Sequence, residues 1–364
     1  MVLAIVLILM VVGSVIFHFW SPWWFTPIAS NWGAMDTTIL ITFWVTGFVF
    51  VVINLFLAYC VVKFKYSPDR KAAYEPENSK LESWLTGLTA LGVFAMLTPG
   101  LVVYNDFVEV PDDAVIIEAV GEQWRWFYRL PGEDGALGKA DNRNVTFENP
   151  VGIDPDDPWG QDDIVLSGAP AHIELGQPIK FNLRSKDVLH DFYVSEFRAK
   201  MDVVPGLVSY FWLTPTRTGT FEVMCAELCG IGHYRMRSEV VVDTPEDYRR
   251  WLSKQTTFAQ SMGKEVAGGN LAERGENLSQ QHGCLACHSL DGSRGVGPTW
   301  KGMYGRTETL ADGSSITADE DYLRESITDA AAKIVEGYPP VMQAYPMSDG
   351  DLDAMIAYFI TLSE

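Results

Sequence analysis

The sequence predicts a multidomain membrane protein made of a helical transmembrane anchor, an all-β domain and a small all-α domain. Three observations predict this fold class. Long apolar runs lie within the first 110 residues, short β-like runs separated by Gly, Pro and Asp begin near residue 112, and helical segments around a cysteine pair fill residues 271–364. A chain of 364 residues is long enough for two or three domains.

The anchor is predicted to occupy residues 1–110. Apolar runs cover residues 2–20, 38–62 and 85–104, and about 20 apolar residues suffice to cross a bilayer as a helix. We therefore expect a helical hairpin over residues 38–105, preceded by an extra N-terminal helix. A cleaved signal peptide is the alternative for the first run, but that run has no basic start and no clear cleavage site, so a retained helix is favoured.

The distribution of basic residues predicts the orientation of the anchor. The loop between the second and third runs holds Lys63, Lys65, Arg70, Lys71 and Lys80, whereas residues 21–37 contain no Lys or Arg. Cytoplasmic loops carry an excess of Lys and Arg. Residues 65–84 are therefore expected in the cytoplasm, and everything after residue 106 on the periplasmic or outer face of the membrane. The formal net charge of −20 argues against nucleic acid as a partner.

Residues 111–247 are predicted to form the β domain, an antiparallel sandwich or barrel. Its most informative segment places four candidate metal ligands on one loop: Cys225, Cys229, His233 and Met236. Two thiolates, an imidazole and a thioether form a soft ligand set that suits copper. A disulfide between the two cysteines and a zinc site are the alternatives, but neither accounts for the methionine.

Residues 248–270 are predicted to be a linker, and residues 271–364 a helical domain. The domain contains Cys284-Leu-Ala-Cys287-His288, the C-x-x-C-H pattern of covalent c-type haem attachment. A chance match or half of a zinc site would be the alternatives. No second cysteine pair follows in the sequence, and Gly297-Pro298 lies about ten residues further on, so haem c is the favoured interpretation.

Four segments of the chain resemble subunit II of the haem–copper oxidases. They are Gly121-Glu-Gln123-Trp124-Arg-Trp126-Phe-Tyr128, Val188-Leu-His190, Lys200-Met-Asp202-Val-Val-Pro205-Gly206 and the loop Cys225–Met236. The resemblance covers about residues 38–245. It implies a cupredoxin-like Greek-key barrel that carries a binuclear copper A centre.

The resemblance also assigns the ligands of that centre. Cys225 and Cys229 would bridge the two copper ions. His190 and His233 would bind one copper ion each, Met236 would complete one site, and the backbone carbonyl of Glu227 would complete the other.

Three more roles are implied by the same family. Trp124 would lie between the electron donor and copper A. The alternative is that Trp124 and Trp126 are core aromatics of the sandwich, which is expected of at least one of them. The carboxylate of Glu227 would reach a Mg or Mn ion at the boundary with subunit I, because carboxylates suit such hard ions. Glu82 would lie at the entrance of a proton channel, although an acidic residue at a helix start also favours the helix dipole.

The order of elements in residues 271–364 resembles a small class I cytochrome c. By this resemblance Cys284 and Cys287 form the thioethers to the haem, His288 is the proximal ligand, and Met342 is the sixth ligand, as in cytochromes c of raised potential. Met347 is the rival for the sixth position.

Together the resemblances imply subunit II of a terminal oxidase with a fused cytochrome c and with no catalytic residue on this chain. Its partners would be subunits I and III, membrane lipid, and a cytochrome c or cytochrome bc complex as electron donor. Two alternatives stay open: the electron-entry subunit of a copper A-containing nitric oxide reductase, and a membrane-tethered redox shuttle without a catalytic partner.

Overall fold

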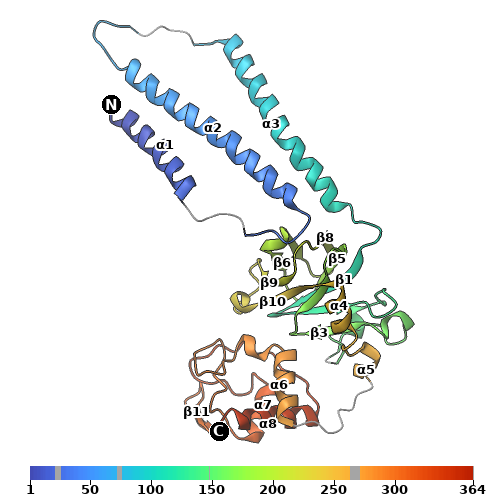
Figure 1. The fold of residues 1–364 in the computed structure, drawn as a ribbon. Coiled ribbons are helices and arrows are strands. Elements are labelled where there is room, and N and C mark those ends of the chain that lie inside the picture. Colours follow the sequence, from blue (N-terminus) through green and yellow to red (C-terminus); the bar gives the residue numbers. More distant parts are fainter. Residues whose placement is uncertain (21–25, 72–75, 147, 263–270, 364) are drawn as a thin grey trace. The chain divides into compact units, whose positions relative to one another are not determined.

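The structure, a computed structural model, describes residues 1–20, 26–71, 76–146, 148–262 and 271–363 (Figure 1). The chain divides into two compact units, Met1–Val110 and Pro111–Glu364. In the described residues, the first unit is helical, and the second holds a β-sandwich followed by a small helical domain. The three-part fold class predicted from the sequence is confirmed.

The first unit contains the helices α1 (Val2–Trp20), α2 (Gly33–Lys63) and α3 (Ser79–Val108). All three are long and apolar enough to cross a membrane. Ala4 and Leu7 of α1 pack against Ala58 of α2. Helices α2 and α3 are longer than the apolar runs of the sequence, because each also includes polar residues at its ends. The side chain of Asn78 caps α3 by accepting the N–H of Leu81.

The β-sandwich consists of two five-stranded sheets with the strand orders β3-β2-β1-β5-β8 and β4-β10-β9-β6-β7. The strands are β1 (Val115–Glu122), β2 (Arg125–Leu130), β3 (Ile164–Ser167), β4 (Ala171–Glu174), β5 (Ile179–Ser185), β6 (His190–Val194), β7 (Ala199–Val203), β8 (Ser209–Leu213), β9 (Gly219–Cys225) and β10 (Arg237–Asp243). The β1–β5 and β4–β10 pairs are parallel and the other pairs antiparallel. Parallel pairs need crossover connections, so the chain crosses repeatedly from one sheet to the other.

The core of the sandwich lies between the two sheets. Strand β5 alternates buried and half-buried residues, which is the period expected of a strand with one face in the core. Phe181 of β5 stacks on Phe211 of β8, and Phe192 of β6, in the other sheet, lies 5.5 and 5.7 Å from these two rings. Side chains two residues apart share a strand face. His190, two residues before Phe192, therefore points toward the interior as well.

Two short helices after the last strand remain attached to the sandwich. They are α4 (Pro245–Leu252) and α5 (Phe258–Met262). Phe258 is 2% exposed and packs with Val120, Phe127 and Ile153, and its N–H donates to the carbonyl of Asp163 at 2.7 Å. The expected linker thus starts with residues that pack on the sandwich, and its remaining part, residues 263–270, lies outside the described residues.

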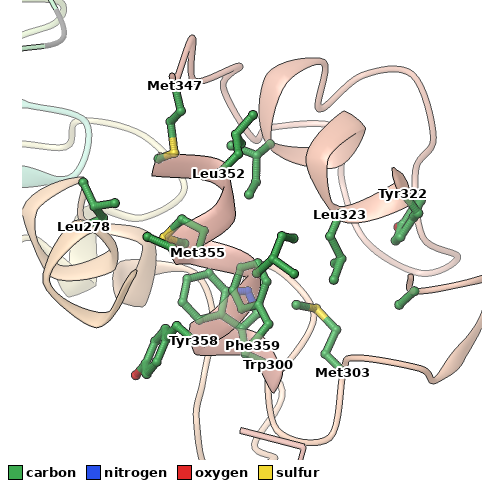
Figure 2. Close-up of a cluster of buried hydrophobic side chains, with 14 residues drawn as sticks. Leu278, Trp300, Met303, Tyr322, Leu323, Met347, Leu352, Met355, Tyr358 and Phe359 are labelled. Atoms are coloured by element: carbon green, nitrogen blue, oxygen red, sulfur yellow. The ribbon is translucent and has the colours of Figure 1, made fainter. Parts of the chain in front are cut away.

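The C-terminal domain is built on helices α6 (Leu271–Gln281), α7 (Glu320–Thr328) and α8 (Asp349–Thr361), with a small hairpin of β11 (Thr307–Thr309) and β12 (Ser315–Thr317). Helix α6 crosses α8 at Gly275, where a Cβ atom would lie 2.1 Å from the carbonyl oxygen of Ala354. Figure 2 shows the core of this domain, in which Trp300 meets Phe359 edge to face at 4.8 Å.

Candidate metal centre and haem cavity

Strand pairing brings the predicted metal ligands together at one end of the second sheet. Cys225 is the last residue of β9, and Met236 directly precedes β10. The N–H of Cys225 donates to the carbonyl of Met236 at 3.1 Å, which closes the loop between the strands. Strand β6 pairs with β9 so that Phe192 lies opposite Cys225. His190, at the start of β6, therefore lies beside the metal loop, defined here as residues 225–236.

The donor atoms of this loop converge. Cys225 Sγ lies 3.7 Å from Cys229 Sγ, 3.9 Å from His190 Nδ1 and 3.2 Å from the carbonyl oxygen of Glu227, and Cys229 Sγ lies 3.5 Å from His233 Nδ1 and 3.8 Å from Met236 Sδ. Both cysteines are free, and their sulfur atoms are too far apart for a disulfide of about 2 Å. Each thiol has its own imidazole neighbour, so the two cysteines and two histidines would be able to hold a pair of metal ions.

The electrostatics of the pair favour a cation between the thiols. A hydrogen bond from Cys229 lowers the pKa of Cys225, and the same interaction, together with burial, raises the pKa of Cys229. One thiolate therefore forms readily and opposes ionisation of the second. A metal ion removes this opposition because its charge stabilises both thiolates.

Asp187 holds the imidazole of His190 in place. Its carboxylate lies 2.8 Å from His190 Nε2 and accepts the N–H of Gln123 at 2.7 Å. Burial lowers the pKa of His190, but the hydrogen bonds to Asp187 and Cys225 outweigh burial and raise it. A proton shared between Nε2 and Asp187 leaves Nδ1 directed at Cys225 as a donor for metal.

The segment between β1 and β2 covers the metal loop. The side-chain amide of Gln123 donates to the carbonyl of Cys229 at 2.8 Å, and the indole N–H of Trp124 donates to the same oxygen at 3.1 Å. A Cβ atom at Gly232 would lie 2.4 Å from Trp124 Cδ2, and one at Gly230 would lie 2.9 Å from Gln123 Nε2. Only glycine allows so close an approach at either position.

A cavity in the second unit is lined by the cysteine motif of the helical domain. Cys284, Cys287 and His288 line it, together with Gln123 and Trp124 of the sandwich. The Nδ1 atom of His288 lies 2.7 Å from the carbonyl oxygen of Pro298, so Nε2 is the ring atom with which His288 would hold a haem. Burial lowers the pKa of His288, which favours the neutral imidazole that a metal requires. The donor set therefore fits a covalently attached haem.

The two candidate methionines differ in their surroundings. Both line the cavity. Met347 is 9% exposed and belongs to the buried cluster with Leu352 and Met355 that Figure 2 shows. Met342 is 38% exposed and lies outside that cluster.

The other predicted residues lie as follows. Glu227 is half-buried on the metal loop, and Trp124 is half-buried against it. Glu82 is exposed in the first turn of α3, where its carboxylate lies 3.5 Å from the N–H of Asn78. The structure brings the proposed copper ligands together around the metal loop. It also brings the haem-attachment residues and both methionines together around the cavity.

Sequence reasoning missed three residues of the site: Asp187, Gly230 and Gly232. The two glycines had a usable signal, because a Gly-x-Gly between metal ligands permits close approach of another segment. Asp187 had no distinct signal beyond its place three residues before His190.

A β-sandwich with a loop of soft metal ligands, followed by a helical domain with a haem-attachment motif, defines a membrane-anchored electron carrier. Residues 115–244 match the family "Cytochrome C oxidase subunit II, periplasmic domain", and residues 272–363 match the family "Cytochrome c". The chain is 58% identical over 266 residues to the "Alternative cytochrome c oxidase subunit 2" of Bradyrhizobium diazoefficiens, an alignment that covers 73% of this chain and 96% of the relative. The chain belongs to the cytochrome c oxidase subunit 2 family.

Two further comparisons concern more distant proteins. The chain is 28% identical over 233 residues to "Cytochrome c oxidase subunit 2" of Cereibacter sphaeroides, covering 58% of this chain and 75% of that one. The crystal structure of the periplasmic domain of subunit II of cytochrome oxidase of Bradyrhizobium japonicum aligns at 24% identity and a TM-score of 0.30, over 40% of this chain and 95% of that one.

Family membership confirms the resemblance to subunit II of a terminal oxidase complex, which implies association with subunit I. The two families imply copper A and haem c as cofactors. The apolar helices indicate a membrane anchor, and the match to a periplasmic domain indicates that the sandwich lies on the outer face.

Proposed function

We propose that this chain is the electron-entry subunit of a haem–copper oxidase in a bacterial inner membrane, passing electrons from a cytochrome through haem c and copper A to an oxygen-reducing, proton-pumping subunit I. One observation carries the proposal. Trp124 lines the haem cavity, and its indole N–H donates to the carbonyl of Cys229 on the metal loop. One side chain thus contacts the surroundings of both cofactors.

The copper ligands proposed are His190, Cys225, the Glu227 carbonyl, Cys229, His233 and Met236. The centre supplies one-electron exchange when it is bound. The protein supplies rigidity, because Cys225, Cys229, Met236 and His190 are all buried. A hydrogen bond between Cys225 and Met236 joins the two ends of the loop, and Gln123 donates a further one to the carbonyl of Cys229. A rigid ligand set changes little with oxidation state, which favours fast transfer.

The haem would be held by Cys284, Cys287, His288 and Met342. The burial of Met347 supports Met342 as the sixth ligand, since packing in the core already explains Met347. Met342 is at the cavity wall without such a packing role.

Trp124 is proposed as the aromatic bridge between donor and copper. The neighbouring Trp126 is 2% exposed and meets Phe192 edge to face at 5.2 Å, so it serves as the core aromatic. Trp124 instead lies half-buried over Gly232, at the surface of the metal loop.

Further assignments rest on the family alone. We propose that Glu227 contributes a carboxylate to a Mg or Mn ion at the boundary with subunit I, and that Glu82 lies at a proton-channel entrance. Subunit III and a cytochrome c or cytochrome bc complex are the proposed additional partners.

The terminal acceptor is tested on the complex that copurifies with this chain. Oxygen consumption with a reduced cytochrome is expected, whereas nitric oxide consumption alone would replace the oxidase by a nitric oxide reductase. In that complex, Trp124→Ala should slow electron transfer from haem to copper while both cofactors remain bound, and Trp124→Phe should retain most of the rate. An unchanged rate in Trp124→Ala would remove Trp124 from the path.

A further inference from the structure

The geometry points to Arg235 as the residue that docks the haem-attachment loop, residues 283–288, onto the metal loop, and so sets the rate of electron transfer between them. This inference rests on the proposed function for its kinetic consequence. The docking contact itself stands on hydrogen bonds within the second compact unit, which contains both loops.

The guanidinium of Arg235 reaches the backbone between the two haem-attaching cysteines. Its Nη1 donates to the carbonyl of Ala286 at 2.9 Å and to that of Leu285 at 3.4 Å. Leu285 and Ala286 lie in the short 3-10 helix Cys284–Ala286, and the last carbonyls of a helix lack partners within it. A charged donor makes a stronger hydrogen bond to such a carbonyl than a neutral one does.

A second arginine flanks the start of the same loop. Gly283 has a φ of +64°, which favours glycine, and a Cβ atom there would lie 3.0 Å from Cδ of Arg125. Arg125 is fixed in turn, because its Nε donates to Glu122 at 2.6 Å and its guanidinium lies 4.7 Å from the ring centroid of Phe127. The haem-attachment loop therefore contacts the sandwich at its start, through Gly283, and at its middle, through Leu285 and Ala286.

The position of Arg235 in the chain gives this contact its functional meaning. Arg235 directly precedes Met236, a proposed copper ligand, and Ala286 directly precedes Cys287, a proposed haem-attaching cysteine. A path of covalent bonds and one hydrogen bond, the one between Arg235 and Ala286, therefore joins the two sites. Electron tunnelling is more efficient along bonds than across a gap, so loss of this contact should slow transfer even with Trp124 in place.

The docking contact is tested by hydrogen exchange on the full chain in detergent, loaded with both cofactors. Arg235→Ala should speed exchange in residues 283–288 about tenfold, as expected when a hydrogen bond to a charged group is lost. Arg237→Ala is the matched control, because it removes the same charge two residues away, where the guanidinium pairs with Glu222 of β9. Equal exchange in Arg235→Ala and wild type would overturn the docking role.

The kinetic consequence is measured in the same preparations by rapid reduction of the haem. Haem-to-copper transfer should slow about tenfold in Arg235→Ala, less in Arg235→Lys, which keeps the charge, and not at all in Arg237→Ala. An unchanged rate in Arg235→Ala, with an intact copper resonance signal, would overturn its role in transfer. Failure of the proposed function is distinguishable, because the wild-type chain itself would then show no haem-to-copper transfer.

Discussion

Asp187 gives a sharp test of how the protein holds its metal site. Its carboxylate lies 2.8 Å from His190 Nε2 and accepts the backbone N–H groups of Gln123 and Val188, each at 2.7 Å. In Asp187→Asn the side chain keeps its shape, but one acceptor oxygen becomes an NH2 donor. In either orientation of the amide, at least one of the three N–H groups loses its acceptor.

The expected effect follows from burial. His190 is 0% exposed, so no water reaches its imidazole, and a buried donor without an acceptor costs about 1–3 kcal/mol. Loss of a partner that orients a metal-binding histidine typically lowers metal affinity by roughly 10- to 100-fold. We expect a loss in this range for Asp187→Asn, and a larger one for Asp187→Ala.

The assay is a competition titration of the purified chain with copper against a chelator, combined with electron paramagnetic resonance. Asp141→Asn is the control, because Asp141 is a surface carboxylate paired with Arg143. Wild-type copper affinity together with a wild-type spectrum in Asp187→Asn would refute the proposed orienting role.

Four other substitutions probe the sandwich, the haem domain and the proposed sixth haem ligand. Phe258→Ala should destabilise the sandwich by about 3–5 kcal/mol in chemical unfolding, because it leaves a cavity in a packed cluster; wild-type stability would mean that α5 is detached in solution. Burial lowers the pKa of His282 from 6.5 to about 4, so the folded state binds fewer protons and stability should rise with pH between these values, by up to about 3 kcal/mol. His282→Gln should flatten that rise when unfolding is followed by haem absorption. Met342→Ala should shift the haem toward high spin and lower its potential, whereas Met347→Ala should chiefly lower stability, and the reverse result would exchange their roles.

Local patterns explain why much of the site could be predicted. Cys225, Cys229, His233 and Met236 lie within twelve residues, so their convergence needs only a strand, a loop and the next strand. The haem-attachment motif is likewise contained in five residues. His190 could be placed only through the family resemblance, because its approach to Cys225 depends on the pairing of β6 with β9.

The residues that support the ligands could not be found in this way. The bonds from Gln123 to Asp187 and to Cys229 join residues 64 and 106 positions apart, and such contacts follow from sheet topology. The packed part of the expected linker was missed for another reason. Two separated aromatic residues make this contact: Trp251 stacks on His172 of β4 at 4.2 Å, and Phe258 packs in the cluster with Val120. Two aromatic side chains seven positions apart leave no clear periodic pattern in the sequence.

The segment between β1 and β2, which contains Gln123 and Trp124, couples the structures of the two cofactor sites. The N–H of Gln123 fixes Asp187 and thereby His190, while its side chain and the Trp124 indole hold the carbonyl of Cys229. The same two residues line the haem cavity. A shift of this segment would therefore move His190, a proposed copper ligand, together with the metal loop at Cys229 and the cavity wall. Hydrogen bonds to Asp187 and to the metal loop hold this segment in place. The haem domain therefore meets a rigid surface there.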